Sequence, residues 1–342
     1  MNLNVAGRRV AIIGGAGFIG HHLALTLKQQ GAHVEVVDSL QVNNLLYYTS
    51  NPELYNRELS LAILNQRLDL LRKAGIPLHP QDARDYSALS RLLSQIAPQV
   101  IVHLAAVSHA GKANKDPYST FDHSLRTLEN ALDFAKDLAE HFIFLSSSMA
   151  YGDFQTPEVS EDHPLNPIGI YGALKVAGEK LVIAYGQVTK LPYTILRPSA
   201  LYGPRCVSRR VGQAFIENAL AGLKLRVDGD GTERLDFTYI ADLVQGLCLA
   251  IQKPEARNQI FNVTYGGARA IQDLIGILRR EFPDLEVEYV ERDALMPVRG
   301  TMSIKKAAAM LGYSPEYSLE RGMKEYVAWY RSLGDVAQPS NA

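Results

Sequence analysis

The chain has 342 residues, and its 35 Lys and Arg nearly balance its 36 Asp and Glu, for a formal net charge of −1. This length fits one large α/β domain or two closely joined domains. The charge balance argues against nucleic acid and membrane surfaces as partners. No apolar run reaches the ~18 residues that a membrane-spanning helix needs.

The two cysteines, Cys206 and Cys248, lie far apart and lack metal-ligand spacing. This pattern favours a reducing compartment and argues against a disulfide framework or a metal site. The first ten residues, MNLNVAGRRV, lack the apolar core of a signal peptide. We therefore expect a cytoplasmic protein without a bound metal.

Short β-branched runs alternate with helical patterns along the chain. The runs expected to form buried strands are RVAIIG, HVEVVD, QVIVHLA, HFIFLSS, YTILRP and QIFNVT. Helices are expected at 20–30, 85–96, 119–140 and 171–188. A long helical excursion at 45–75 follows the second strand, and its role, packing or a lid, stays open. The alternation predicts a parallel sheet covered on both faces.

From Arg205 onward the pattern changes to a helix, a turn-rich segment and further helices near 241–252, 270–281 and 318–332. We interpret this part as a smaller lobe laid over the sheet. The expected domains are 1–186 and 187–334. Strands near 192–198 and 259–264 are expected to return to the first sheet.

Three glycines, Gly14, Gly17 and Gly20, follow the first strand at intervals of three residues and open a helix. Such a loop permits a tight turn, lets the backbone approach a pyrophosphate and lets the helix pack on the strand. The helix N-terminus then presents free N–H groups to phosphates. Asp38 ends the next strand, where a carboxylate accepts hydrogen bonds from a ribose and repels a 2′-phosphate. NAD is therefore favoured over NADP.

Tyr171 and Lys175 lie four residues apart, on one face of a predicted helix. An ammonium group beside a phenol stabilises the phenolate, so Tyr171 can act as a base. Ser146, Ser147 and Ser148 end the strand HFIFL, at the sheet edge where α/β proteins bind ligands. We favour Ser147 as the serine that polarises the reacting oxygen, with Ser148 as the runner-up.

These stretches together resemble the extended short-chain dehydrogenase/reductase family, in the NAD-dependent epimerase/dehydratase branch that acts on nucleotide sugars. The similarity covers roughly residues 8–332. Seven motifs occur in the family's order: GGAGFIG, HLAA, SSSMAYG, YGALK, LRPSALYGP, GDGTERLDFTYIADL and LGYSP. The resemblance implies a Rossmann-type, doubly wound parallel sheet with a smaller C-terminal α/β substrate lobe. It also implies a homodimer formed through helices near 119–138 and 171–188.

The resemblance implies site residues as well. The expected NAD contacts are Gly14, Gly17, Phe18, Ile19, Gly20, Asp38, Ser39, Asp82, Ala83, Leu104, Ala105, Ala106, Ser146, Tyr171, Lys175 and Pro198. The expected substrate contacts are Ser108, Ser147, Ser148, Met149, Ser199, Val211, Arg226, Arg234 and Arg299. Among the latter, Arg234 and Arg299 match arginines that hold the nucleotide diphosphate, a role that suits planar guanidinium groups.

The chain also departs from the family pattern. Members that dehydrate the sugar usually carry an Asp–Glu pair just after the catalytic Ser or Thr, and decarboxylating members keep a glutamate there. Here these positions are Ser148 and Met149. In addition, Ser124 stands where the family commonly has Asn, and Ser199 where some epimerases have Asn.

We therefore expect an NAD-dependent epimerase of a UDP-linked hexose, acting at C4 through a transient 4-keto sugar. Tyr171 takes the 4-hydroxyl proton, Ser147 polarises the oxygen and Lys175 lowers the pKa of Tyr171. The alternatives are a nucleotide-sugar reductase or dehydrogenase, a dehydratase or decarboxylase of the same family, and a non-catalytic NAD-binding regulator. Neither the sugar nor the base follows from the sequence.

Overall fold

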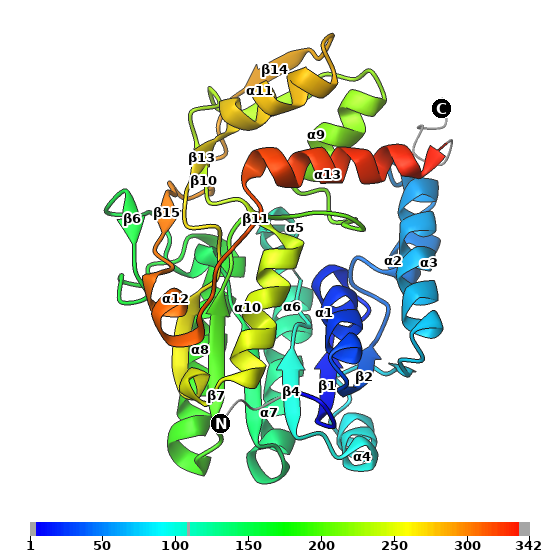
Figure 1. The fold of residues 1–342 in the computed structure, drawn as a ribbon, viewed down its shortest axis with the longest axis vertical. Coiled ribbons are helices and arrows are strands. Elements are labelled where there is room, and N and C mark those ends of the chain that lie inside the picture. Colours follow the sequence, from blue (N-terminus) through cyan, green and yellow to red (C-terminus); the bar gives the residue numbers. More distant parts are fainter. Residues whose placement is uncertain (1–4, 108–109, 335–342) are drawn as a thin grey trace.

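A seven-stranded sheet forms the centre of the computed structural model, which describes residues 5–107 and 110–334 (Figure 1). All strands run parallel, in the order β12-β7-β5-β4-β1-β2-β3. Their bounds are β1 (Arg9–Ile13), β2 (His33–Asp38), β3 (Leu78–Pro80), β4 (Val100–His103), β5 (His141–Leu145), β7 (Tyr193–Arg197) and β12 (Gln259–Asn262). The doubly wound prediction is confirmed, and the strand order reverses between β1 and β4.

Helices cover both faces of the sheet because its strands are apolar on both sides. Val10 and Ile12 of β1 belong to the core under α1 (Phe18–Gln29) and α10 (Ile240–Gln252). Ala11 and Ile13 point the other way, into the core under three other helices. These are α4 (Tyr86–Ile96), α7 (Thr127–Leu138) and α8 (Gly169–Thr189).

The excursion after β2 forms two helices rather than one, α2 (Leu45–Thr49) and α3 (Arg57–Lys73). Pro52 lies between them, and Asn56 has a left-handed backbone with φ 52°. Proline cannot continue the hydrogen bonding of a helix interior, so the chain turns there. α3 packs against α1 (Figure 1).

The expected helix at 119–140 is also divided. α5 (Ala110–Lys115) and α6 (Pro117–Phe121) lead into a π-helical turn, η1 (Asp122–Arg126), which continues into α7. A π turn shifts the side chains that follow it and is frequent at functional sites. Ser124, one of the departures from the family pattern, lies on this turn.

The smaller lobe lies at one end of the sheet (Figure 1). It contains α9 (Val211–Leu220), α11 (Ile271–Glu281), α13 (Leu319–Ser332) and two strand pairs, β9 (Leu225–Asp228) with β14 (Val287–Val290) and β10 (Arg234–Leu235) with β13 (Arg269–Ala270). The remaining elements are η2 (Ser148–Ala150), β6 (Glu158–Val159), β8 (Leu201–Tyr202), β11 (Thr238–Tyr239), η3 (Pro254–Ala256), β15 (Thr301–Met302) and α12 (Lys305–Leu311).

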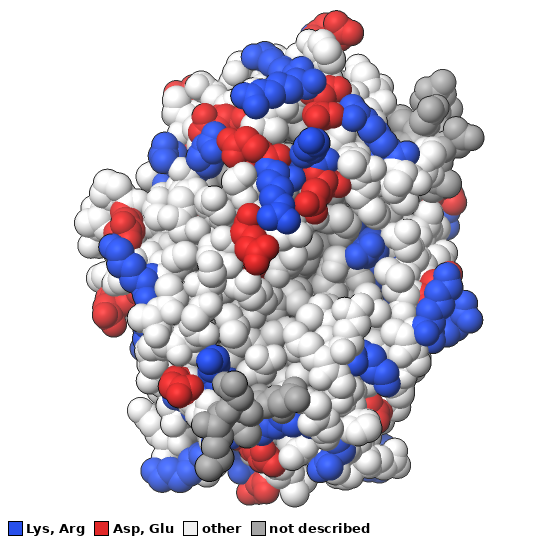
Figure 2. Space-filling model, in the orientation of Figure 1, with Lys and Arg blue, Asp and Glu red and all other residues white. Residues whose placement is uncertain are grey.

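Charged side chains of both signs are intermixed over the lobe, at the top of the face shown in Figure 2. Within the residues that the structure describes, no helix has the length and apolar character needed to cross a membrane.

Candidate active site

The glycine loop lies where the strand order reverses. Gly14 follows β1 with φ +82°, and a Cβ atom there would come within 2.7 Å of the Ala105 nitrogen, just beyond β4. Glycine is therefore needed both for the turn and for the close approach of the two strand ends. Gly17 then caps α1, so the free N–H groups of the first helical turn lie beside the loop.

One cavity at the ends of β1, β2, β3 and β4 is lined by twelve of the sixteen residues predicted to contact NAD; Ser146, Tyr171, Lys175 and Pro198 are not in its lining. Its lining includes Gly14, Gly17, Phe18, Ile19, Gly20, Asp38, Ser39, Asp82, Ala83, Leu104, Ala105 and Ala106. The same cavity is lined by residues that the sequence analysis did not name, among them Arg67, His123, Thr127 and Ser208, and by Arg210. This lining fits a dinucleotide. The N-terminus of a helix can bind its phosphates, and the carboxylates can accept hydrogen bonds from its hydroxyl groups.

Asp38 is fixed at the tip of β2 by two backbone donors. Its oxygens accept from the Ala16 nitrogen at 3.0 Å and from the Leu40 nitrogen at 2.8 Å. Burial raises the pKa of Asp38, and these two N–H groups act in the opposite direction. The carboxylate therefore borders the glycine loop in a fixed orientation, which suits a ribose-binding role.

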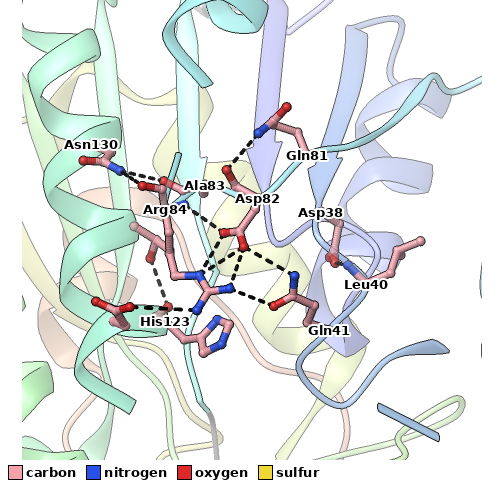
Figure 3. A network of polar contacts seen from close by, with 11 residues as sticks. Asp38, Leu40, Gln41, Gln81, Asp82, Ala83, Arg84, His123 and Asn130 are labelled. Carbon is pink, nitrogen blue, oxygen red and sulfur yellow. Dashed lines mark hydrogen bonds and ion pairs between the residues drawn. The ribbon is translucent and has the colours of Figure 1, made fainter. Parts of the chain in front are cut away.

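A second network of polar side chains surrounds Asp82, as Figure 3 shows. Arg84 NH2 donates to Asp82 Oδ2 at 2.6 Å and to Gln41 Oε1 at 3.0 Å. Burial opposes the ionisation of Asp82, but the hydrogen bonds and charge of Arg84 outweigh it and lower the pKa of Asp82. Asn130 of α7 donates to the Ala83 and Arg84 carbonyls, both at 2.9 Å, and so holds this loop in place.

The predicted catalytic side chains meet at the end of β5. Tyr171 lies in the first turn of α8, and Ser147, which caps η2, is a neighbour of the phenol. The approach of these two elements depends on Gly172, because a Cβ atom there would lie 2.5 Å from the Met149 carbonyl oxygen. Lys175, one turn further along α8, is buried, and its Nζ lies 5.8 Å from the centroid of the Tyr171 ring.

The electrostatics of Tyr171 differ from the sequence-based expectation. Burial raises the pKa of the Tyr171 phenol, while the guanidinium of Arg210 and the hydroxyl of Ser147 act to lower it. The Lys175 ammonium donates to the Leu145 carbonyl at 2.7 Å, and its lowering of the Tyr171 pKa stays a prediction. Arg210, at the start of α9, is thus a cation near the phenol that sequence spacing did not reveal.

The burial of Lys175 makes the free energy of unfolding depend on pH. Burial lowers the pKa of Lys175 from 10.5 to about 8, and Glu179 opposes this effect. Below pH 8 the amine is charged in both the folded and unfolded states, so the cost of burying the charge is fully present. Between about pH 8 and 10.5 the folded state releases the proton first, and this cost is relieved.

We therefore expect the unfolding free energy of the wild type to rise relative to that of Lys175→Met as the pH increases across this window. Chemical denaturation at a series of pH values, without added nucleotide, measures the difference. A difference that stays constant with pH would mean that the pKa of Lys175 is not depressed.

A buried ionic network lies behind the serines and was not predicted. Arg197 NH2 lies 2.6 Å from Glu179 Oε2, and both side chains are at most 2% exposed. Ser146 donates to the same carboxylate, and Arg197 NH1 donates to the Tyr151 hydroxyl at 2.9 Å. Tyr151 in turn donates to Asn262 Oδ1 at 2.7 Å. The motifs SSSMAYG and LRPSALYGP contain three of these residues, but their spacing does not reveal the pairing with α8.

The predicted substrate residues lie in several places. Ser148, Met149 and Ser199 are buried around η2, beside the predicted NAD contact Pro198, whose carbonyl accepts from the Ser148 nitrogen at 2.8 Å. Val211 begins α9. Arg226 is 71% exposed and lines a separate depression with Arg209. Ser108 lies outside the described residues.

Arg299 and Arg234 both belong to the lobe. Arg299 NH2 lies 3.6 Å from Glu233 Oε1, and Arg234 NH2 donates to the Ala268 carbonyl. The buried Arg299 Nε has no hydrogen-bond partner among the described residues. An unpaired buried donor of this kind costs free energy, and a diphosphate oxygen would offset this cost.

Known proteins share this architecture. Residues 10–264 match the model of the NAD dependent epimerase/dehydratase family. UDP-glucuronate 4-epimerase 4 of Arabidopsis thaliana is 28% identical, over 95% of this chain and 76% of its own length. A crystal structure of UDP-glucuronic acid 4-epimerase from Bacillus cereus with UDP-glucuronic acid and NAD gives a TM-score of 0.84 at 27% identity, covering 95% of this chain and 99% of that one.

UDP-glucose 4-epimerase from Thermotoga maritima, solved with UDP-glucose, gives a TM-score of 0.83 at 26% identity, with the same coverage of both chains. The glycine loop, the parallel sheet and the reversal in strand order therefore have counterparts in solved structures of similar overall shape.

Proposed function

Because the chain belongs to the NAD-dependent epimerase/dehydratase family, we propose that it epimerises a UDP-linked hexose at C4. The observation that carries the proposal is the arrangement at the sheet edge. The dinucleotide cavity and the set of Ser147, Tyr171 and Lys175 meet there, joined by Arg210, which lines the cavity and acts on the Tyr171 phenol. The relatives that act on UDP-glucuronate and UDP-glucose support C4 as the reacting carbon.

Each residue has a distinct part in this reaction. Tyr171 takes the proton of the 4-hydroxyl group, and Ser147, a neighbour of the phenol, polarises the same oxygen. When bound in the cavity, NAD would supply the hydride acceptor for C4 and the hydride donor for the opposite face of the 4-keto sugar. Arg234 and Arg299 hold the diphosphate while the 4-keto sugar turns, so that Tyr171 can return the proton.

The positions after Ser147 favour epimerisation over dehydration. Removing water across C5 and C6 needs an acid and a base next to the sugar. Ser148 and Met149 occupy η2, are buried and provide no carboxylate. Positions 148 and 149 therefore offer no carboxylate to drive elimination, which favours reduction of the 4-keto sugar from its other face.

The test is the mass of the product from a panel of nucleotide sugars incubated without added cofactor. We expect a new chromatographic peak of unchanged mass, because hydride leaves and returns within one cycle. Loss of water or of CO₂ would contradict the assignment and indicate a dehydratase or decarboxylase. Conversion only after NAD(P)H or NAD is supplied would indicate a reductase or dehydrogenase.

The proposal includes a cytoplasmic homodimer with domains 1–186 and 187–334. The free thiols of Cys206 and Cys248 suit a reducing compartment. Leu138, at the end of α7, is 62% exposed, and Val188, near the end of α8, is 81% exposed. Both apolar side chains lie on the helices expected at the dimer interface. Light scattering tests this assembly, and a mass equal to that of one chain would contradict it.

A further inference from the structure

Arg67 is an unusual residue of the insertion helix α3. Its side chain is 1% exposed, yet it lines the same cavity as Gly14, Gly17 and Asp38. Within the described part of the chain, no carboxylate oxygen lies within the 4.0 Å of an ion pair with its guanidinium group. Burial lowers the pKa of Arg67 to about 10, which reflects a charge without adequate compensation.

The contacts of Arg67 lead back to the glycine loop. Its Nε donates to the Arg205 carbonyl at 2.9 Å, and its NH2 donates to the same oxygen. Arg205 Nε donates to His21 Nε2 at 2.9 Å, and His21 Nδ1 donates to the Gly17 carbonyl at 2.9 Å. Burial lowers the pKa of His21 well below 6.5, which agrees with a neutral ring that can accept from Arg205. Arg67 is therefore connected to the turn that begins α1.

The segment 204–210 is held over the same cavity by the insertion. The Tyr48 hydroxyl of α2 donates to the Val207 carbonyl at 2.5 Å, next to the Arg205 carbonyl held by Arg67. Val207, Ser208 and Arg210 of this segment all line the cavity. The insertion thus shapes one wall of the cofactor site as well as packing against α1.

A buried guanidinium whose hydrogen bonds go to one carbonyl costs free energy unless an anion balances its charge. The N-terminus of α1 already favours negative charge in the same cavity. We propose that Arg67 binds the diphosphate of NAD, so that the insertion of residues 45–75 serves to retain the cofactor. The proposal rests on the cofactor and not on the sugar chemistry, so it can fail while C4 epimerisation stands.

Two substitutions separate this role from a structural one. Arg67→Gln keeps a donor for the Arg205 carbonyl and removes the charge, whereas Arg67→Lys keeps the charge. Arg72→Gln on the same helix is the control, because Arg72 is 73% exposed and, among residues 5–107 and 110–334, its side chain pairs only with Asp69. NAD extracted from each purified protein gives the occupancy, and thermal unfolding with added NAD, ADP, NADP or adenosine gives the affinities.

We expect Arg67→Gln to lose roughly 10- to 100-fold in affinity for NAD and ADP, the range for a charge-assisted hydrogen bond. Its affinity for adenosine and its unfolding temperature without nucleotide should change little, and Arg67→Lys should recover part of the loss. Affinities for NAD and ADP within twofold of wild type would overturn the proposal. So would an equal loss for adenosine, which would indicate a distorted loop, or a loss confined to NADP, which would indicate a 2′-phosphate site.

Discussion

Replacing Tyr171 by Phe should lower turnover of the nucleotide sugar by roughly 10²- to 10⁴-fold, the usual contribution of a positioned acid–base group. The phenol is the group that we propose takes the 4-hydroxyl proton, and Ser147 is its neighbour. Lys175 has a depressed pKa, but its amine is engaged with the Leu145 carbonyl, so it does not replace the phenol. The measurement is the rate of product formation at saturating substrate.

The NAD content of the purified Tyr171→Phe protein should match that of wild type, because the substitution leaves the glycine loop and Asp38 unchanged. Tyr185→Phe on the same helix is the matched control and should retain full turnover, since Tyr185 lies away from η2 near the other end of α8. Turnover of Tyr171→Phe close to that of wild type would remove Tyr171 from the mechanism.

The sheet and the cofactor cavity could be predicted because their signals are local. Val10 to Ile13 form a continuous apolar strand, and the glycines that follow fix both the turn and the start of α1. A parallel strand places its carboxyl end at the same edge as its neighbours. Asp38 and Leu104 therefore meet Gly14 once the strand order is known.

The residues that the sequence analysis missed are those whose partners lie far along the chain. Arg67 lies on α3 and contacts Arg205. The residue spacing of α3 alone indicates an amphipathic helix and does not indicate this contact. Arg84 pairs with Asp82 two residues away, but its contact with Gln41 exists only because β2 and β3 are neighbours in the sheet. Pro52 indicates the break between α2 and α3, but the helical pattern on both sides of it favours one continuous helix.

The buried pair of Glu179 and Arg197 should dominate the stability of the region behind the active site. Burial opposes the charge of Arg197, but the hydrogen bonds and charge of Glu179 outweigh it and raise the pKa of Arg197. Arg197→Met would leave the Glu179 carboxylate buried without its ion-pair partner. We expect the free energy of unfolding to fall by about 3–5 kcal/mol, the cost of breaking a buried pair by removing one partner. Urea denaturation measures it.

The comparison with an exposed pair makes this prediction specific. Arg126 and Glu129 lie 2.7 Å apart with side chains 48% and 49% exposed, so Arg126→Met should cost less than about 1 kcal/mol. Adding Glu179→Gln to Arg197→Met should recover part of the loss, because it removes the uncompensated charge while the amide can still accept from Ser146. Equal losses for Arg197→Met and Arg126→Met would mean that Glu179 finds water or another donor, and that the network does not support the strand end carrying Ser147.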